Sequence, residues 1–244
     1  MVTSVYDLRA FYECKRGRII QPLLQERILS LWPDVKDMRL MGAGYALPYM
    51  EPYLETSERS FAVMPAQFGV HAWTPQQKNL ACIAAEDELP VETESIDRIL
   101  AVHGLEYSDH TEPCLQEYWR VLKSTGRILL VVPNRRGFWA RAEWSPFGHG
   151  TPFSASQLTR ILRENLFVIE RVERALYVPA LRSSMLLRSC VPFERYGRYF
   201  MGGMSGVLLV EASKQLYSGI AVHNTAKARA GGRKILVAST AAGG

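Results

Sequence analysis

The stretch MRLMGAGYALPYMEP, residues 38–52, gives the first indication of the fold. Apolar residues lead into Gly42-Ala43-Gly44, and a second apolar stretch follows. This order predicts a β-strand over 37–41, a glycine turn, and a helix beginning after Pro48, because glycine permits a sharp turn and proline is tolerated in a first helical turn. In a doubly wound sheet such a turn lies near the nucleotide-binding crevice. Two glycines alone fit a purely structural turn equally well.

Further along the chain, apolar runs alternate with helical patterns. Strands are predicted at 60–64, 80–84, 98–102 and 126–132, helices at 111–122 and 154–164, and two final strands at 167–177 and 206–212. Nearly continuous apolar runs are typical of parallel strands covered on both faces. The prediction is a Rossmann-like, doubly wound α/β sheet of about seven strands, mostly parallel and ending in an antiparallel hairpin.

The sequence also suggests how the chain is organised. Apolar spacing over 4–31 predicts N-terminal helices within residues 1–35, interrupted near Gly17 and Pro22. We expect one domain over 1–215, in which 135–205 forms a substrate, lid or partner region. Residues 216–244 are predicted to be a flexible basic tail.

Composition excludes some classes of function. The 244 residues are 48% hydrophobic and 22% charged, as in ordinary globular proteins. The net charge is +5, and the chain after Glu211 contains five Lys and Arg residues and no acid. The folded body is therefore near neutral, which argues against nucleic-acid binding.

Cysteine and histidine spacing also bears on the class of protein. The four cysteines are scattered without a CxxC pair, which fits reduced thiols in the cytoplasm and argues against structural zinc. The five histidines form no spaced ligand pair, so no metal is expected. The N-terminus does not resemble a signal peptide, and no segment is apolar enough to cross a membrane.

Two motifs between residues 86 and 134 resemble a known family. Glu88-Leu89-Pro90 followed by Ser95-Ile96-Asp97 resembles an LPF…SFD signature, and residues 117–127, EYWRVLKSTGR, resemble E-x-x-R-V-L-K-P-G-G-x. Both are typical of class I S-adenosylmethionine-dependent methyltransferases of the small-molecule branch. The resemblance covers about 36–135, and two further segments, VMPAxxGV and FGHGxPFS, are similar to a bacterial subgroup.

The resemblance implies S-adenosyl-L-methionine as cofactor and assigns residues to its site. Glu86 or Asp87 would accept from the adenine amine, and His103 is a candidate base or pocket wall, although a structural role fits it equally well. His149 is the second candidate base, in an aromatic loop, and the catalytic residue stays open. The full set of implied cofactor contacts is Gly42, Ala43, Gly44, Met64, Pro65, Glu86, Asp87, His103 and Glu106.

The chain departs from the family pattern at several polar positions. Leu40 stands where an acid precedes the first glycine, Ala46 replaces the third glycine, and Met64-Pro65 replace the acid that holds the ribose. Hydrogen bonds to charged groups contribute about 1.5–3 kcal/mol each. Losing two such bonds to the ribose predicts donor binding weakened by roughly one hundredfold or more. An acid restored at Met64 is expected to tighten binding.

The methyl acceptor, a small molecule or a protein, is not indicated by the sequence. A non-catalytic methyltransferase-fold protein that binds or regulates a partner is the alternative, supported by the missing acids. A dinucleotide-dependent enzyme is opposed by the lack of a full GxGxxG. The apolar and arginine-rich segment 181–200 fits a lid, a partner-binding helix, a membrane-surface helix or a cover for the sheet.

Overall fold

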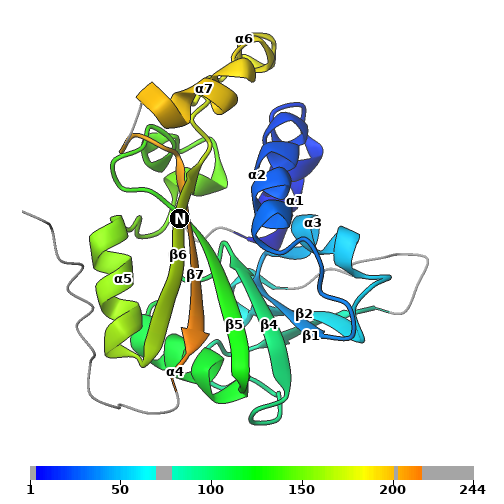
Figure 1. Ribbon diagram of the computed structural model, residues 1–244. Helices are drawn as coiled ribbons and strands as arrows, with labels where there is room; N and C mark the ends of the chain where they lie inside the picture. Colours follow the sequence, from blue (N-terminus) through cyan, green and yellow to red (C-terminus); the bar gives the residue numbers. More distant parts are fainter. Residues whose placement is uncertain (1–3, 70–78, 201–202, 216–244) are drawn as a thin grey trace, which may run out of the picture.

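One seven-stranded sheet organises the protein (Figure 1). The computed structural model describes residues 4–69, 79–200 and 203–215. Strands occur in the order β3-β2-β1-β4-β5-β7-β6; β1 to β5 are parallel, and β7 is antiparallel to both its neighbours. The bounds are β1 Arg39–Gly44, β2 Arg59–Pro65, β3 Ala81–Ala84, β4 Ile96–Val102, β5 Leu122–Pro133, β6 Phe167–Ala175 and β7 Val207–Lys214. The predicted fold class is confirmed.

The strand order reverses at β1, which lies between β2 and β4. Gly42 pairs with Ala62 on one side and with Leu100 on the other, and Gly44 pairs with Val102. The carboxyl ends of β1 and β4 therefore lie side by side at the switch point, where ligands of open α/β sheets bind.

The glycine segment corrects the prediction of a turn beginning after residue 41. β1 continues through Gly44 because the β4 ladder extends to this residue. Gly44 itself has φ of 70°, in the left-handed region, so the chain turns only there. The helix that follows, α3 (Leu47–Met50), has a single turn and is extended by a 3₁₀ turn at Glu51–Tyr53.

The helices partly follow the predicted limits. The break at Gly17 is confirmed, but the predicted break at Pro22 is wrong, because Pro22 lies inside α2. Pro22 and Arg18 are both exposed, so water can bond the carbonyl that Pro22 leaves without a donor. Bounds are α1 Val5–Glu13, α2 Gly17–Leu31, α4 Thr111–Val121, α5 Ala155–Glu164, α6 Ser184–Ser189 and α7 Pro192–Phe200. Short 3₁₀ turns lie at Ala66–Phe68, Trp139–Arg141 and Pro146–Gly148.

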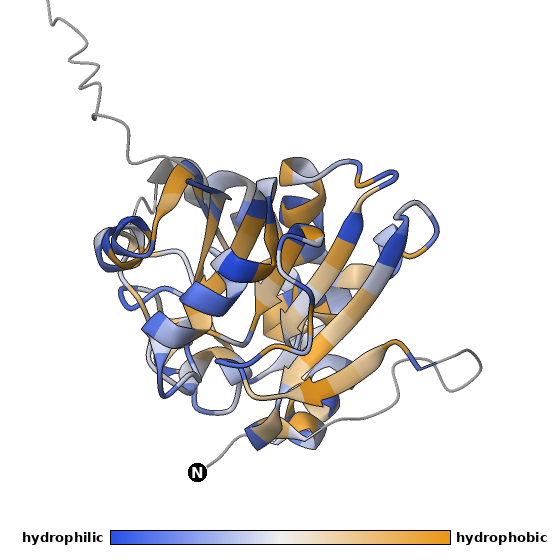
Figure 2. Ribbon diagram, turned by 90° about the horizontal axis from the view of Figure 1, so that it is seen from below, coloured by the Kyte–Doolittle hydropathy of each residue, from blue (hydrophilic) through white to orange (hydrophobic). Residues whose placement is uncertain are grey.

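Two apolar clusters cover the two faces of the sheet. One joins the inner side chains of α1, α2 and α3 to one face, and the other joins those of α4 and α5 to the opposite face. Figure 2 shows the hydrophobic strands at the centre, with hydrophilic stretches on the surrounding helices. In the described part of the chain, no helix is long and apolar enough to cross a membrane. The predicted tail 216–244 lies outside the described residues.

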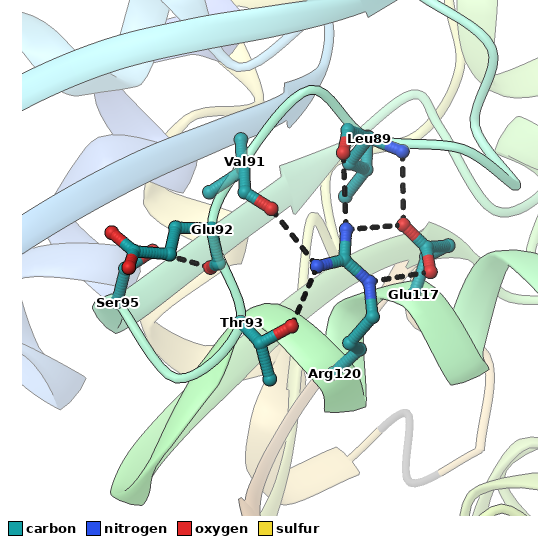
Figure 3. A network of polar contacts seen from close by, with 7 residues as sticks. All are labelled: Leu89, Val91, Glu92, Thr93, Ser95, Glu117 and Arg120. Carbon is teal, nitrogen blue, oxygen red and sulfur yellow. Dashed lines mark hydrogen bonds and ion pairs between the residues drawn. The ribbon is translucent and has the colours of Figure 1, made fainter.

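The residues that carry the family resemblance form a clamp (Figure 3). The Arg120 guanidinium binds both oxygens of Glu117 at 2.8 Å and donates to the carbonyls of Leu89 and Val91 and to the Thr93 hydroxyl. Glu117 also accepts from the Leu89 amide at 2.9 Å. The end of α4 thus holds the turn that feeds β4, so these motif residues are structural.

Arg120→Ala is expected to lower the free energy of unfolding by about 2 kcal/mol, because several charge-assisted bonds are lost from a partly buried site. That corresponds to a fall of roughly 4–8 °C in melting temperature for a domain of this size. The guanidinium lowers the pKa of Glu117, so this stability is present above the ordinary carboxyl pKa and is lost as pH falls through the lowered value.

Thermal melts at pH 7 and at acid pH measure this difference. The control is Arg160→Ala, which removes an exposed i,i+4 pair with Glu164 and should change stability by less than about 0.5 kcal/mol. Equal effects of the two substitutions would contradict the clamp.

Candidate functional site

The ends of β1 and β4 are in backbone contact at two glycines. A Cβ on Gly44 would meet the Val102 carbonyl oxygen and lie 2.7 Å from both Cα and N of Gly104. The Tyr45 amide donates to the same carbonyl at 2.6 Å. Glycine at 44 is therefore required by the chain's own packing, a reason that the sequence did not indicate.

Two other predicted donor contacts lie against the protein interior. A Cβ on Gly42 would meet the Met50 sulfur, so the thioether fills the space that glycine leaves. Met64 is fully buried and belongs to the cluster beneath α1, α2 and α3, and Pro65 is buried beside it. A carboxylate at position 64 would therefore enter this cluster.

Four side chains form a buried hydrogen-bonded chain beyond β4. The Tyr49 hydroxyl donates to Tyr12 at 3.0 Å, which leaves the Tyr12 hydrogen for His103 Nε2 at 2.7 Å. His103 Nδ1 then carries the ring proton and donates to Glu106 Oε1 at 3.1 Å. His103 is fully buried, with φ of 50°, and contacts the Glu106 carboxylate.

Tyr12 and Tyr49 show what sequence reasoning missed. Tyr12 occurs in the apolar pattern of α1 and Tyr49 in that of α3, and both side chains are buried as that pattern indicates. Burial raises the pKa of both phenols, that of Tyr12 well above its ordinary value. Both hydroxyls therefore stay protonated and donate. One feature of the sequence points to both residues. Each places a tyrosine hydroxyl on the apolar face of a helix, and a buried hydroxyl needs a hydrogen-bond partner from the elements that the helix packs against.

Glu106 lines a cavity of about 600 Å³ at the carboxyl edge of the parallel strands. Its other walls come from Phe68 after β2, from residues 107–109 after β4 and from the loop 148–151. The Thr151 amide donates to the Glu106 carbonyl at 2.7 Å, which holds the loop against the site. The volume lies within the range of small-molecule sites, about 300–1,000 Å³.

A second cavity of about 400 Å³ lies between α1 and residues 143–146. Glu143 and His149 line both cavities. Of the two candidate bases, His149 lines both of these cavities, whereas His103 lines neither and is fully buried.

Glu86 lies beside the turn that follows β4. Its carboxyl hydrogen-bonds with Ser108, a wall residue of the larger cavity, and burial raises its pKa. Its Oε2 has no partner among the described residues. Asp87 is exposed next to it. A buried carboxyl oxygen without a donor, on a residue that is itself partly exposed, can accept from a ligand amine that reaches it.

Comparison with known families identifies the domain. Residues 41–130 match a family model described as a methyltransferase domain. Within residues 41–130, the chain carries a methyltransferase domain. The cofactor of such methyltransferases is S-adenosylmethionine. The matched segment begins within β1 and contains β2, β3, β4, most of β5 and the clamp. The comparison with curated protein sequences gave no significant match.

Solved structures show the same fold at low identity. A Thermotoga maritima S-adenosylmethionine-dependent methyltransferase, described as a possible histamine N-methyltransferase, is 16% identical with a TM-score of 0.58, covering 86% of this chain and 96% of its own. A complex of Haloferax volcanii Trm112 methyltransferase activator with its methyltransferase partner gives 15% and 0.61, covering 88% and 100%. Geranyl diphosphate C-methyltransferase from Streptomyces coelicolor, crystallised with S-adenosyl-L-homocysteine, gives 16% and 0.56, covering 78% and 75%.

Proposed function

We propose that this methyltransferase binds its donor and acceptor side by side at the carboxyl edge of β2, β3 and β4. The observation that carries the proposal is the cavity of about 600 Å³, which is lined by Glu106, Ser108 and His149. Glu86 is hydrogen-bonded to Ser108 and so lies next to this wall. The acceptor is a small molecule or a protein segment that reaches this cavity.

The residues present fit the donor in two respects. Glu86 offers an unpaired carboxyl oxygen to an adenine amine, and the acidic cavity suits a sulfonium cation. The family's carboxylate that accepts from the ribose hydroxyls is missing, because Met64 stands at that position and is buried. We assign the adenine contact to Glu86 with Asp87 beside it, and the backbone around Gly42, Ala43, Gly44 and Pro65 remains the proposed floor of the donor site.

The donor supplies an activated methyl group, so the protein's task is chiefly positioning. Tyr107 packs edge-to-face on Phe68 at 5.1 Å and donates to the Pro146 carbonyl at 2.7 Å, which fixes the cavity wall. Glu106 and His149 are the titratable groups placed to handle an acceptor proton. His103 orients Glu106 from behind.

Calorimetric titration with S-adenosylmethionine and S-adenosylhomocysteine tests this proposal. We expect saturable binding that Glu86→Ala weakens by about tenfold or more, because a hydrogen bond to a carboxylate is lost. Asp87→Ala, an exposed neighbour, should change affinity by less than about threefold. Absence of saturable binding to the wild type in the millimolar range would overturn the proposal.

A non-catalytic role through a protein partner is the second candidate, favoured by one surface. Leu187 of α6 is buried, whereas four large apolar side chains of α6 and α7 are exposed: Met185, Leu186, Phe193 and Tyr196. The complex with the Trm112 activator shows that a protein of this fold can use a partner. The donor titration separates the two candidates.

The proposed methyltransferase function includes two further expectations from the sequence. They are a single domain over 1–215 and a bacterial cytoplasmic setting.

A further inference from the structure

The carboxylate of Glu106 is buried with one oxygen unsatisfied. Its side chain is 0% exposed, Oε1 accepts from His103, and Oε2 has no partner among the described residues. The chain from Tyr49 through Tyr12 and His103 runs donor to acceptor and ends at Oε1, so these groups use their hydrogens within the protein. A buried carboxylate oxygen without a donor is costly. Glu106 lines the cavity, but its carboxylate has no accessible surface and lies behind the cavity wall. A ligand in the cavity can therefore supply the missing donor by displacing part of that wall.

The charge of the cavity limits the chemistry of that ligand. Glu106, Asp109 and Glu143 line it, and none of the described lining residues is Lys or Arg. The rings of Phe68 and Tyr107 form another part of the wall. Carboxylates together with aromatic faces attract cations, whereas a phosphate or carboxylate ligand would meet only repulsion from these acids.

We propose that Glu106 binds the ammonium group of an amine acceptor in this cavity and removes the proton that occupies its lone pair. The inference rests on the proposed function and assigns its substrate class. The ammonium donates to Oε2 and transfers one proton to it, which frees the nitrogen lone pair. A bond then forms from nitrogen to the methyl carbon while the sulfur–methyl bond breaks, its electron pair stays on sulfur, and the proton on Glu106 returns to water.

A series of ligands with one shape and three charges tests the inference on the full chain. The probes are 2-phenylethylamine, 2-phenylethanol and phenylacetate, titrated calorimetrically with and without S-adenosylhomocysteine. We expect the amine to bind at least about tenfold more tightly than the alcohol and the acid, from one charge-assisted hydrogen bond. Equal affinities, or no amine binding in the millimolar range, would overturn the inference.

Glu106→Gln and Asp109→Asn form a matched pair of variants. Each removes one carboxylate from the same cavity, but Glu106 is buried whereas Asp109 is exposed. Glu106→Gln should remove the preference for the amine, and Asp109→Asn should lower amine affinity by less than about threefold. A preference that survives Glu106→Gln contradicts the assignment. If Glu106→Gln does not fold, as judged by circular dichroism, the charge series on the wild type decides alone.

Donor titrations separate this inference from the proposed function. One outcome is that the wild type binds S-adenosylmethionine and that Glu106→Gln weakens this binding but leaves the affinity for the amine unchanged. The carboxylate then binds the donor's own ammonium or sulfonium group. That result overturns the acceptor assignment and leaves the function intact. If the wild type binds no donor, the proposed function fails, whatever the amine series shows.

Discussion

Met64→Asp destabilises the protein strongly and does not tighten donor binding. Met64 is fully buried in the cluster beneath α1, α2 and α3. Truncating a buried methionine costs about 2–5 kcal/mol, and an unpaired polar group adds about 1–3 kcal/mol. We therefore expect a loss of at least about 3 kcal/mol in the free energy of unfolding. This reverses the expectation from the family pattern, in which an acid at this position holds the ribose.

Urea unfolding of Met64→Asp beside Met64→Leu measures this loss. The leucine variant keeps the volume and apolar character, so it should cost less than about 1.5 kcal/mol. A Met64→Asp protein with the stability of the wild type and tighter S-adenosylmethionine binding would show that the side chain faces the ribose. Donor affinity is measured only on variants that give a cooperative unfolding transition.

Gly44→Ala has the second large expected effect, a loss of about 3 kcal/mol or more. Two costs combine at this residue. Its φ of 70° costs an L-residue roughly 1–2 kcal/mol. In addition, the new Cβ would meet the Val102 carbonyl and the Gly104 backbone, which cannot move without opening the β1–β4 contact.

Gly69→Ala separates these two costs. Gly69 has a similar φ of 77°, but a Cβ there would only touch a Val5 methyl at 3.8 Å. Its ψ of −174° lies in a region that glycine alone adopts readily, so the variant should lose about 1–3 kcal/mol from strain alone. Denaturant unfolding of both variants gives the difference. Equal losses would show that the contact with Gly104 relaxes, so that glycine at 44 serves only the turn.

The family motifs show what can and cannot be predicted from neighbouring residues in the sequence. Glu117 and Arg120 were recognisable at once, yet their role is to clamp the turn before β4. The family pattern also predicted Gly42, Gly44 and Met64 as donor contacts. That pattern contains the order of residues along the chain but not the side chains that pack against them. Met50 fills the space at Gly42, and Gly104 meets Gly44. These neighbours lie on other elements, so no local pattern reveals them.

The sequence by itself determined the sheet and its strands. Apolar runs, glycine and the cap at Ser154 act through local backbone preference and burial, which are properties of neighbouring residues. Only the tertiary structure decided which polar groups are satisfied. Tyr12 reaches His103, and Tyr49 reaches Tyr12, from helices distant in sequence, whereas Glu106 Oε2 has no donor among the described residues. Hydrogen-bond partners are set by how elements pack.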